Sequence, residues 1–151
     1  MDANELASGV AHQMLSDEGT GPAWGIRIDE ARAGYCRLSM ELRDDMLNGH
    51  RIAHGGMVFA LADTAFAYVC NGGNERTVAA QASIVFLGSA EAGETLVAEA
   101  EELATSGRSG VTRVSVKTAA GRAVAEFTGY SRTIGGAVVE NAKIGPGSSP
   151  G

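Results

Sequence analysis

Residues 48–64 read NGHRIAHGGMVFALADT, and the apolar run that follows the glycine pair continues to Cys70. The segment Met57–Cys70 contains no Gly or Pro, and its length favours a helix over a strand. The NGGN sequence at residues 71–74 ends this helix and offers glycine for a left-handed C-cap. A helix that is apolar almost all round must be covered on most sides. The rest of the chain must therefore supply a layer that surrounds it.

The flanking sequence predicts one further helix and a series of strands. Apolar side chains at helical spacing indicate a helix over about residues 4–18, which the GTGP sequence at residues 19–22 ends. Two runs on either side of Ala33-Gly34 indicate a hairpin, and residues 44–52 are polar and loop-like. Strands are predicted over residues 78–87, 95–104, 111–118 and 124–133, although Glu and Ala leave a helical alternative for residues 94–101. We predict an α+β fold in which an antiparallel sheet wraps around a central helix.

Bulk composition limits the class of protein. The chain has 151 residues, which suits a single domain over residues 1–136, and we predict a flexible C-terminal tail over residues 137–151. A net charge of -6 argues against nucleic acid or an anionic membrane as a partner, and we expect neither a leader nor a membrane-spanning stretch. The two cysteines form no disulfide framework, and the three histidines lack zinc-site spacing. We expect a reducing cytoplasmic location and no metal.

The acidic residue inside the apolar helix, Asp63, has three interpretations. It lies about two turns beyond the helix start, too far inside to be a cap. It could be the solvent-facing position of a half-exposed helix, but its neighbours at helical spacing, such as Phe59 and Phe66, are apolar. We favour a functional carboxylate in a cleft or subunit interface, where partial desolvation would raise its pKa towards the range of a general base.

The glycine pair stands at the helix start, where backbone amides have no internal acceptor and carry the positive end of the helix dipole. Gly55 and Gly56 would let another group approach this backbone closely, either as an oxyanion site or simply as a tight turn into the helix. At about 1.5 Å per residue, Gly55 and Asp63 lie roughly 12 Å apart along one helix. If both act on one carbonyl, a second subunit must present its Asp63 to the first subunit's Gly55, as two antiparallel helices about a twofold axis would do.

These motifs resemble the phenylacetyl-CoA thioesterase (PaaI-type) family of hotdog-fold acyl-CoA thioesterases. The likeness covers about residues 7–136, and HGG followed by LADTAFAY at this spacing is its most specific part. Its segments are Asn48-Gly-His, His54-Gly-Gly, Leu61–Asn71, Ser83–Leu87, Gly93–Leu96, Gly110–Thr112 and Phe127–Ser131.

The resemblance implies hydrolysis of an acyl-CoA thioester, with coenzyme A as part of the substrate and no cofactor. It implies homodimers with a joined sheet, commonly paired into tetramers, and a site shared between subunits. Asp63 would be the base or nucleophile and Gly55 the oxyanion donor, while Asn48 would orient the thioester or the water. His54 would either brace the helix start or act directly, and Thr64 would contact the water.

The expected substrate contacts come from three places. An aryl-acetyl group would suit an apolar pocket that uses Met46, Leu47, Phe59 and Phe66, and Gly56 would lie beside the oxyanion site. The family often has Arg-Pro where this chain has Gly88-Ser89, so a cationic contact to the CoA phosphates is either missing there or supplied by Arg108 or Arg132. The turn Arg108, Ser109, Gly110 is the predicted contact near the nucleotide.

Two other functions remain open from the sequence. An enoyl-CoA hydratase or dehydratase on the same fold would use His54 with an acid, although the LADT segment fits the thioesterase group better. A non-catalytic acyl-CoA binding module would keep the groove without turnover.

Overall fold

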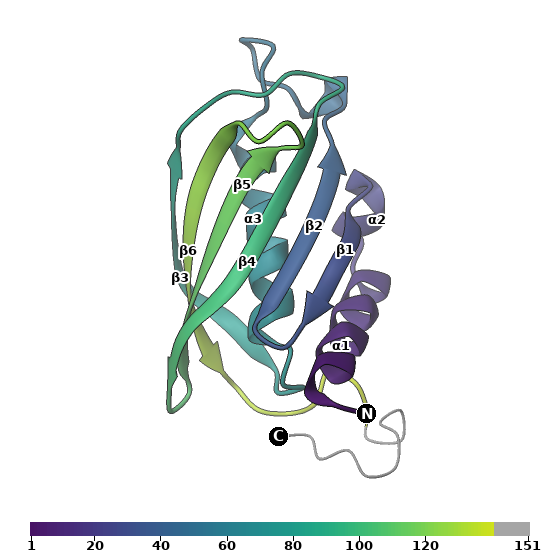
Figure 1. Cartoon of the computed structure of the whole chain (residues 1–151), viewed down its shortest axis with the longest axis vertical. Helices are drawn as coiled ribbons and strands as arrows, with labels where there is room; N and C mark the ends of the chain where they lie inside the picture. Colours follow the sequence, from purple (N-terminus) through teal and green to yellow (C-terminus); the bar gives the residue numbers. More distant parts are fainter. Residues whose placement is uncertain (141–151) are drawn as a thin grey trace.

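The computed structural model describes residues 1–140. Its elements follow the chain in the order helix, short helix, hairpin, long helix and four strands (Figure 1). Their bounds are α1 Ala3–Asp17, α2 Thr20–Trp24, β1 Arg27–Arg32, β2 Tyr35–Glu41, the 3-10 turn η1 Asp44–Met46, α3 Gly55–Cys70, β3 Thr77–Phe86, β4 Thr95–Ser106, β5 Ser109–Thr118 and β6 Ala123–Thr133.

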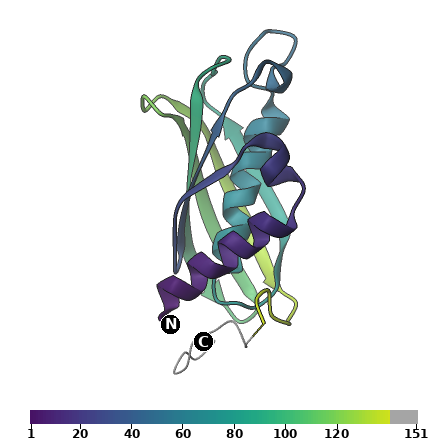
Figure 2. The ribbon, with the colours of Figure 1, turned by 90° about the vertical axis from the view of Figure 1, so that its right-hand side faces the viewer.

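The strands form one six-stranded antiparallel sheet in the order β1-β2-β4-β5-β6-β3. The sheet curves over α3, which lies along one of its faces, and α1 crosses beside α3 on the same side (Figures 1 and 2). The prediction of an antiparallel sheet around a long apolar helix is therefore confirmed. The strand interpretation of residues 94–101 is confirmed too, since β4 pairs along its length with β2 and β5.

The core lies between α3 and the sheet. Leu61, Ala62 and Ala65 of α3 are fully buried against inward-facing residues of the strands, such as Leu38 and Val116. Small residues set how closely the layers approach, because a Cβ on Gly129 of β6 would lie 2.7 Å from the ring of Phe66. The helix is thus held at a fixed height and rotation over the sheet, which leaves its opposite face away from the strands.

The N-terminal helices differ from the sequence interpretation at one point. The GTGP segment does end α1, but it then forms a second short helix, α2, which ends at Gly25 in a left-handed conformation (φ 67°). Pro22 fits there because it lies in the first turn of α2, where its missing N–H would have no acceptor in any case. Together α1 and α2 form a wall beside α3.

The C-terminal segment is described up to Glu140, so the predicted tail over residues 141–151 lies outside the described residues. Val139 is buried against Leu6 and Val10 of α1. The Asn74 side chain accepts from the amides of Val138 (3.0 Å) and Val139 (2.8 Å). Ordered contacts of the domain therefore continue three residues beyond Gly136. None of the helices within residues 1–140 is long and apolar enough to cross a membrane.

Candidate active site

The start of α3 presents an unpaired backbone amide. His54 is the N-cap, and its Nδ1 accepts a hydrogen bond from the Gly56 amide (2.9 Å) while its own amide donates to the Met46 carbonyl (2.9 Å). A neutral histidine that accepts through Nδ1 carries its proton on Nε2. The Gly55 amide has no acceptor among residues 1–140. The helix therefore offers one free N–H at its positive end, where an oxyanion would be stabilised.

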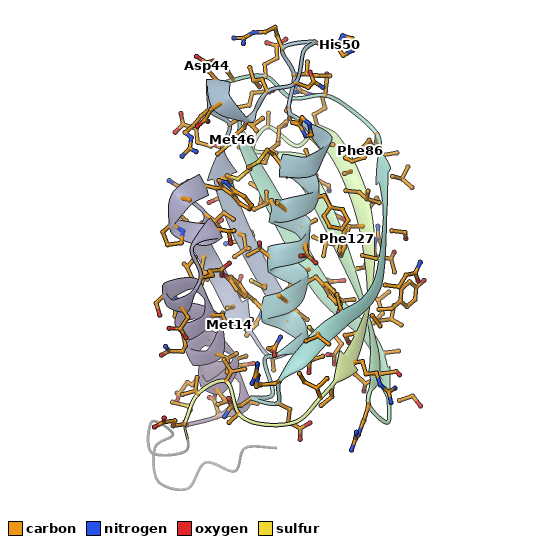
Figure 3. All side chains as sticks on the ribbon, turned by 180° about the vertical axis from the view of Figure 1, so that it is seen from behind. Met14, Asp44, Met46, His50, Phe86 and Phe127 are labelled. Atoms are coloured by element: carbon orange, nitrogen blue, oxygen red, sulfur yellow. The ribbon has the colours of Figure 1, made fainter. Side chains whose placement is uncertain are left out.

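The aromatic ring of Phe86 lies over this position. A Cβ added to Gly55 would meet the Phe86 Cζ at 3.0 Å, so glycine allows the close approach. Phe86 ends the edge strand β3, and its side chain is 53% exposed (Figure 3). A ring that is this exposed can turn away without disturbing the core, so access to the Gly55 amide depends on a mobile side chain rather than on backbone.

Asn48 organises the loop that leads into α3. Its Oδ1 accepts from the amides of His50 (2.9 Å) and Ile52 (3.4 Å), and its backbone amide donates to the Ile52 carbonyl (2.8 Å). Arg51 completes this tight turn in a left-handed conformation (φ 63°). Because Oδ1 is committed to the loop, the side-chain NH₂ of Asn48 is the group left to meet a ligand.

Asp63 is half-buried on the face of α3 that points away from the sheet. It lines a cavity of about 410 Å³ between α3 and the N-terminal helices. Burial raises the pKa of its carboxyl above the ordinary value. No residue among 1–140 donates a hydrogen bond or forms an ion pair with it. The cavity is lined by Met14, Asp17, Glu18, Thr20, Trp24, Ala60, Asp63, Thr64, Ala67 and Tyr68.

Two neighbours of Asp63 have restricted chemistry. The Thr64 hydroxyl donates to the Ala60 carbonyl one turn earlier (2.7 Å), so towards a ligand it can only accept. Burial raises the pKa of the Cys70 thiol to about 12, so this thiol stays protonated at neutral pH and is a poor nucleophile.

The four side chains predicted to form the acyl pocket do not border the cavity beside Asp63. Met46 and Phe66 are at most 2% exposed and belong to the core, and Phe59 packs edge-on against Phe127 with ring centroids 5.3 Å apart. Leu47 forms a bridge with Ala53 at the base of the loop. Their acyl-binding role therefore stays a prediction that a single protomer does not test.

Met14, Trp24 and Tyr68 line the cavity beside Asp63, and the sequence did not point to them. The α3 side of the cavity could have been found from the helical spacing of Ala60, Asp63 and Ala67, which share one face. The α1 and α2 side had no such signal, because its position depends on how the N-terminal helices pack on the domain.

The predicted CoA contact lies at the opposite end of the protomer from Gly55. Arg108, Ser109 and Gly110 form the tip of the β4–β5 hairpin, which approaches the end of β6 and the Thr77 end of β3. Arg132 lies opposite Ser109 in the sheet, so both cations named from the sequence are at this tip. A single protomer does not bring them to the Gly55 amide.

The departure at Gly88-Ser89 has a physical reason. A Cβ on Gly88 would lie 2.5 Å from the Ala123 carbonyl oxygen, so an arginine cannot take this backbone path. The Ser89 carbonyl instead accepts from Arg122, through Nε (3.2 Å) and Nη2 (3.0 Å), and Arg122 also pairs with Glu94 (2.8 Å). The local cation is thus already engaged in closing this loop.

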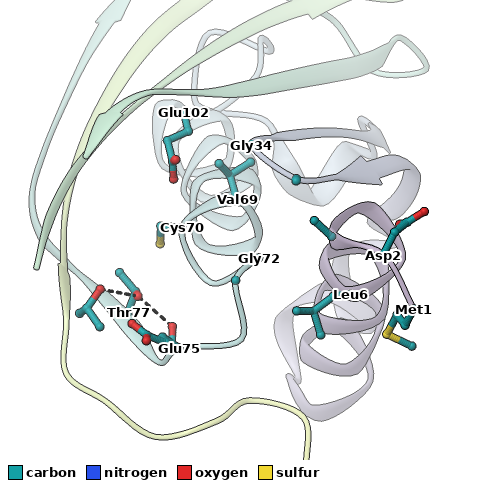
Figure 4. Close-up of a pocket in the computed structure, with 14 residues that line it drawn as sticks. Met1, Asp2, Leu6, Gly34, Val69, Cys70, Gly72, Glu75, Thr77 and Glu102 are labelled. Carbon is teal, nitrogen blue, oxygen red and sulfur yellow. Dashed lines mark hydrogen bonds between the residues drawn. The ribbon is translucent and has the colours of Figure 1, made fainter. Parts of the chain in front are cut away.

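A second cavity, of about 400 Å³, lies at the C-terminal end of α3 (Figure 4). Its lining includes Cys70, Glu75, Thr77 and Glu102, and none of the predicted site residues. Gly55 and Asp63 therefore lie away from this cavity, at the start of α3 and beside the cavity described first.

Comparison of the sequence and the structure with known proteins identifies the family of this chain. The thioesterase superfamily model matches residues 50–125. The acyl-coenzyme A thioesterase PaaI of Escherichia coli (strain K12) is 38% identical over 132 residues, which cover 87% of this chain and 94% of that protein. The structure of the E. coli PaaI protein from the phenylacetic acid degradation operon superposes with a TM-score of 0.88 at 37% identity, covering 90% of this chain and 99% of that one.

Two further solved structures share the fold. A mutant of the phenylacetic acid degradation protein PaaI from Thermus thermophilus is 32% identical, with a TM-score of 0.74 over 78% of this chain and all of that one. A Streptococcus mutans protein bound to acetyl CoA is 26% identical, with a TM-score of 0.71 over 73% of this chain and 89% of that one.

The chain belongs to the thioesterase superfamily, and within it to the PaaI-type family of hotdog-fold acyl-CoA thioesterases. The family and fold that the sequence resemblance implied are therefore confirmed.

Burial of Asp63 should cost stability. The pKa of the Asp63 carboxyl is higher in the folded protein than in the unfolded chain. The ionised carboxylate therefore lowers the free energy of unfolding at pH values above both pKa values, and this loss disappears once the pH falls below the pKa of the unfolded chain. We therefore expect Asp63→Asn to raise Tm at pH 7 and to lose this advantage below about pH 4, where an unfolded carboxyl is protonated. Thermal unfolding across pH measures this. Asp17→Asn, at an exposed carboxylate that accepts from Gln13, is the control without such a gain. A lower Tm for Asp63→Asn at neutral pH would contradict the assignment.

Proposed function

We propose that this protein hydrolyses acyl-CoA thioesters, with phenylacetyl-CoA or a hydroxylated aryl-acetyl-CoA as substrate, to the free acid and coenzyme A. The observation that carries the proposal is the pairing, on one helix, of a free amide at Gly55 with a partly desolvated, unpaired carboxylate at Asp63. The name of the E. coli relative and the acetyl CoA in the S. mutans structure support the class of substrate. A role in phenylacetic acid degradation follows from the same relative.

The chemistry needs these two groups on opposite sides of one carbonyl. The Gly55 amide donates to the thioester oxygen and stabilises the negative charge of the tetrahedral intermediate. In one route Asp63 takes a proton from a water molecule, which attacks the thioester carbonyl carbon. In the other route the Asp63 carboxylate attacks that carbon and forms an anhydride, which water then hydrolyses. In both routes the C–S bond breaks, and the thiolate of coenzyme A leaves and takes up a proton. The Asn48 NH₂ orients the thioester or the water, and the Thr64 hydroxyl can accept from that water.

His54 acts mainly by positioning in this proposal. Its Nδ1 is occupied by the Gly56 amide, which fixes the first turn of α3 and aims the Gly55 N–H outwards. Its Nε2–H remains available as a donor to the substrate. Gly56 lies beside the bound carbonyl without donating to it.

A second subunit has to complete the site. Gly55 and Asp63 are separated by roughly 12 Å along α3, so one protomer cannot bring both to one carbonyl. The edge strand β3 has a free side among residues 1–140, and Val78, Val85 and Phe86 on it and Leu87 just after it are 46 to 60% exposed. The outer face of α3 next to Asp63 is lined by small residues, such as Ala60 and Ala67. Pairing β3 with a partner's β3 would continue the sheet and set the two α3 helices antiparallel.

The same pairing would place the partner's hairpin tip near the start of α3. Arg108, with Ser109 and Gly110 beside it, would then meet the CoA phosphates of that site, and Arg132 would add charge. We expect Arg108→Ala to raise KM several-fold for an acyl-CoA. For the corresponding N-acetylcysteamine thioester, which has no phosphates, KM should not change. A Ser109→Ala variant is the control for disturbance of the tip, and equal effects on both substrates would remove this contact.

The assembly and its surroundings complete the proposal. We expect two dimers to pair into a homotetramer, as the family resemblance implies. A reducing cytoplasm agrees with the two free thiols at Cys36 and Cys70. The reaction as written uses no metal and no cofactor, since an aspartate and a backbone amide suffice.

The two alternatives are less well supported. A hydratase would need His54 as a base, but its Nδ1 is already used as a helix cap, so only the protonated Nε2 faces outwards. A pure binding module has no need for a desolvated carboxylate in its groove, because an unpaired buried charge costs stability.

Release of free thiol tests the reaction directly. We expect the protein to release coenzyme A from phenylacetyl-CoA faster than from acetyl-CoA or palmitoyl-CoA. Asp63→Ala should lower kcat at least about 100-fold, because general acid–base catalysis typically contributes that much. A protein that releases no thiol from any of the three but shifts the absorbance of crotonyl-CoA would be a hydratase. Binding without turnover over hours would leave a binding module.

Mixed dimers test the shared site. Gly55 is the first residue of α3, where proline is tolerated, and His54 already has the extended backbone (φ -65°, ψ 132°) that a following proline requires. Gly55→Pro removes the N–H and adds a ring whose Cβ meets Phe86, whereas Gly55→Ala adds the same Cβ and keeps the N–H. We expect Gly55→Pro and Asp63→Asn to be inactive separately.

Mixing these two inactive proteins should restore activity. In each mixed dimer one site holds both changes and the other holds neither, so random mixing gives about a quarter of the wild-type activity. Gly55→Ala should stay active throughout. If the mixture remains as inactive as its components, Gly55 and Asp63 do not act together across the interface.

A further inference from the structure

The segment that precedes α3 is held from two sides. The Ala53 amide donates to the carbonyl of Ala90 (2.8 Å), which lies in the loop between β3 and β4 (residues 87–94, the β3–β4 loop). The next amide, that of His54, donates to the Met46 carbonyl (2.9 Å). Gly55 follows directly, so the place of its free amide depends on where the β3–β4 loop holds Ala53.

The β3–β4 loop is in turn fixed by a side chain from another part of the chain, Arg122. Its guanidinium donates to the Ser89 carbonyl through Nε (3.2 Å) and Nη2 (3.0 Å), and Nη2 also donates to the two carboxylate oxygens of Glu94 (2.9 and 2.8 Å). Glu94 accepts from the Glu91 amide as well (2.7 Å). These contacts lie on both sides of Ala90 along the chain, so one planar group spans the loop around the carbonyl that holds the segment before α3.

Arg122 itself is firmly placed. Its amide donates to Oγ1 of the buried Thr118 (3.1 Å), and its carbonyl accepts from the Thr118 amide (2.9 Å), in the turn between β5 and β6. This turn and the β3–β4 loop lie at the same end of the molecule as the start of α3 (Figure 1). The Glu91 amide and Arg122 lower the pKa of Glu94, so the carboxylate stays charged at neutral pH.

A contribution to folding is a poor explanation for this arrangement. The side chains of Arg122 and Glu94 are 52% and 31% exposed, and ion pairs this accessible to water contribute little to stability. Their geometric effect is larger, because a backbone carbonyl and a carboxylate of the same loop are held on one rigid fork. Placement matters at a reacting centre, where an error of about 1 Å can cost about 100-fold in rate.

We propose that Arg122 is a positioning residue for the oxyanion site. Through Ser89 and Glu94 it fixes the β3–β4 loop, and through Ala53 this loop fixes the direction of the Gly55 amide. Arg122 acts through the backbone and does not touch the reacting atoms. This inference rests on the proposed thioesterase function.

The chain offers a matched control in Arg113 of β5. Its Nε (3.2 Å) and Nη2 (3.1 Å) donate to Glu126 of β6, with side chains 57% and 36% exposed, and within residues 1–140 it makes no hydrogen bond to the β3–β4 loop. We expect Arg122→Ala and Arg113→Ala to lower Tm by similar amounts, within about 5 °C, because both pairs are exposed.

The kinetic constants should separate the two variants. We expect only Arg122→Ala to lower kcat for an acyl-CoA, by about 10-fold, less than the roughly 100-fold cost of losing an oxyanion donor outright, with KM within about twofold of wild type. Arg122→Lys should recover most of this loss, because an ammonium group can still donate to both acceptors. Wild-type kcat in Arg122→Ala, or an equal loss in Arg113→Ala, would overturn the inference. A raised KM with unchanged kcat would make Arg122 a substrate contact and overturn it too.

Hydrogen exchange tests the same inference without turnover. In Arg122→Ala we expect the Ala53 amide to exchange at least about 10-fold faster, because its acceptor is no longer held, while amides of the central strand β5 exchange at the wild-type rate. Arg113→Ala should leave the exchange of Ala53 unchanged. If the wild-type protein hydrolyses no acyl-CoA, the proposed function fails on its own. An Ala53 amide that exchanges no faster in Arg122→Ala overturns the inference whether or not the protein is active.

Discussion

The rigidity of α3 is the constraint on which the rest of the structure depends. The helix is held by buried contacts along its sheet-facing side, and the Phe66 ring against Gly129 fixes its height over the sheet. A packed helix cannot bend to bring Gly55 towards Asp63, so their separation of roughly 12 Å is fixed by helix geometry. Any reaction that uses both groups therefore has to be built from two copies of the helix, and the free edge of β3 has the geometry to align them.

The chemistry and the stability of α3 pull in opposite directions at Asp63. Sixteen residues of almost continuous apolar sequence make this helix a core element, and its carboxylate is partly desolvated and has no partner within residues 1–140. Desolvation weakens folding and strengthens the carboxylate as a base by one and the same shift in pKa. The site lies on the outer face of α3, where the cost is limited because water or a partner can still reach the group.

The sequence predicted the parts of this structure that depend on local pattern. The apolar run of α3, the alternation of the strands and the glycine pair at the helix start each have a signal within a few residues, so the sheet around α3 and the positions of Gly55 and Asp63 followed. The cavity wall did not follow, because Trp24 and Asp63 border the same cavity only through the packing of α1 and α2 on α3. Phe66 and Met46 are buried in the core of the protomer, and the sequence could not show this, because only tertiary packing decides whether an apolar side chain near a site lines a pocket or fills the core.

Residues of α3 and its preceding loop differ in one physical respect from the cavity-lining residues of α1 and α2. The groups expected to break the thioester lie on α3 and its preceding loop, where backbone geometry fixes an amide and a carboxylate regardless of what the acyl group is. The other wall of the cavity beside Asp63 comes from α1 and α2, which contribute no strand to the sheet. Side chains such as Met14 and Trp24 can therefore change the size and polarity of the cavity without moving Gly55 or Asp63. A fold arranged in this way can keep one reaction while its substrate changes with the packing of the two N-terminal helices.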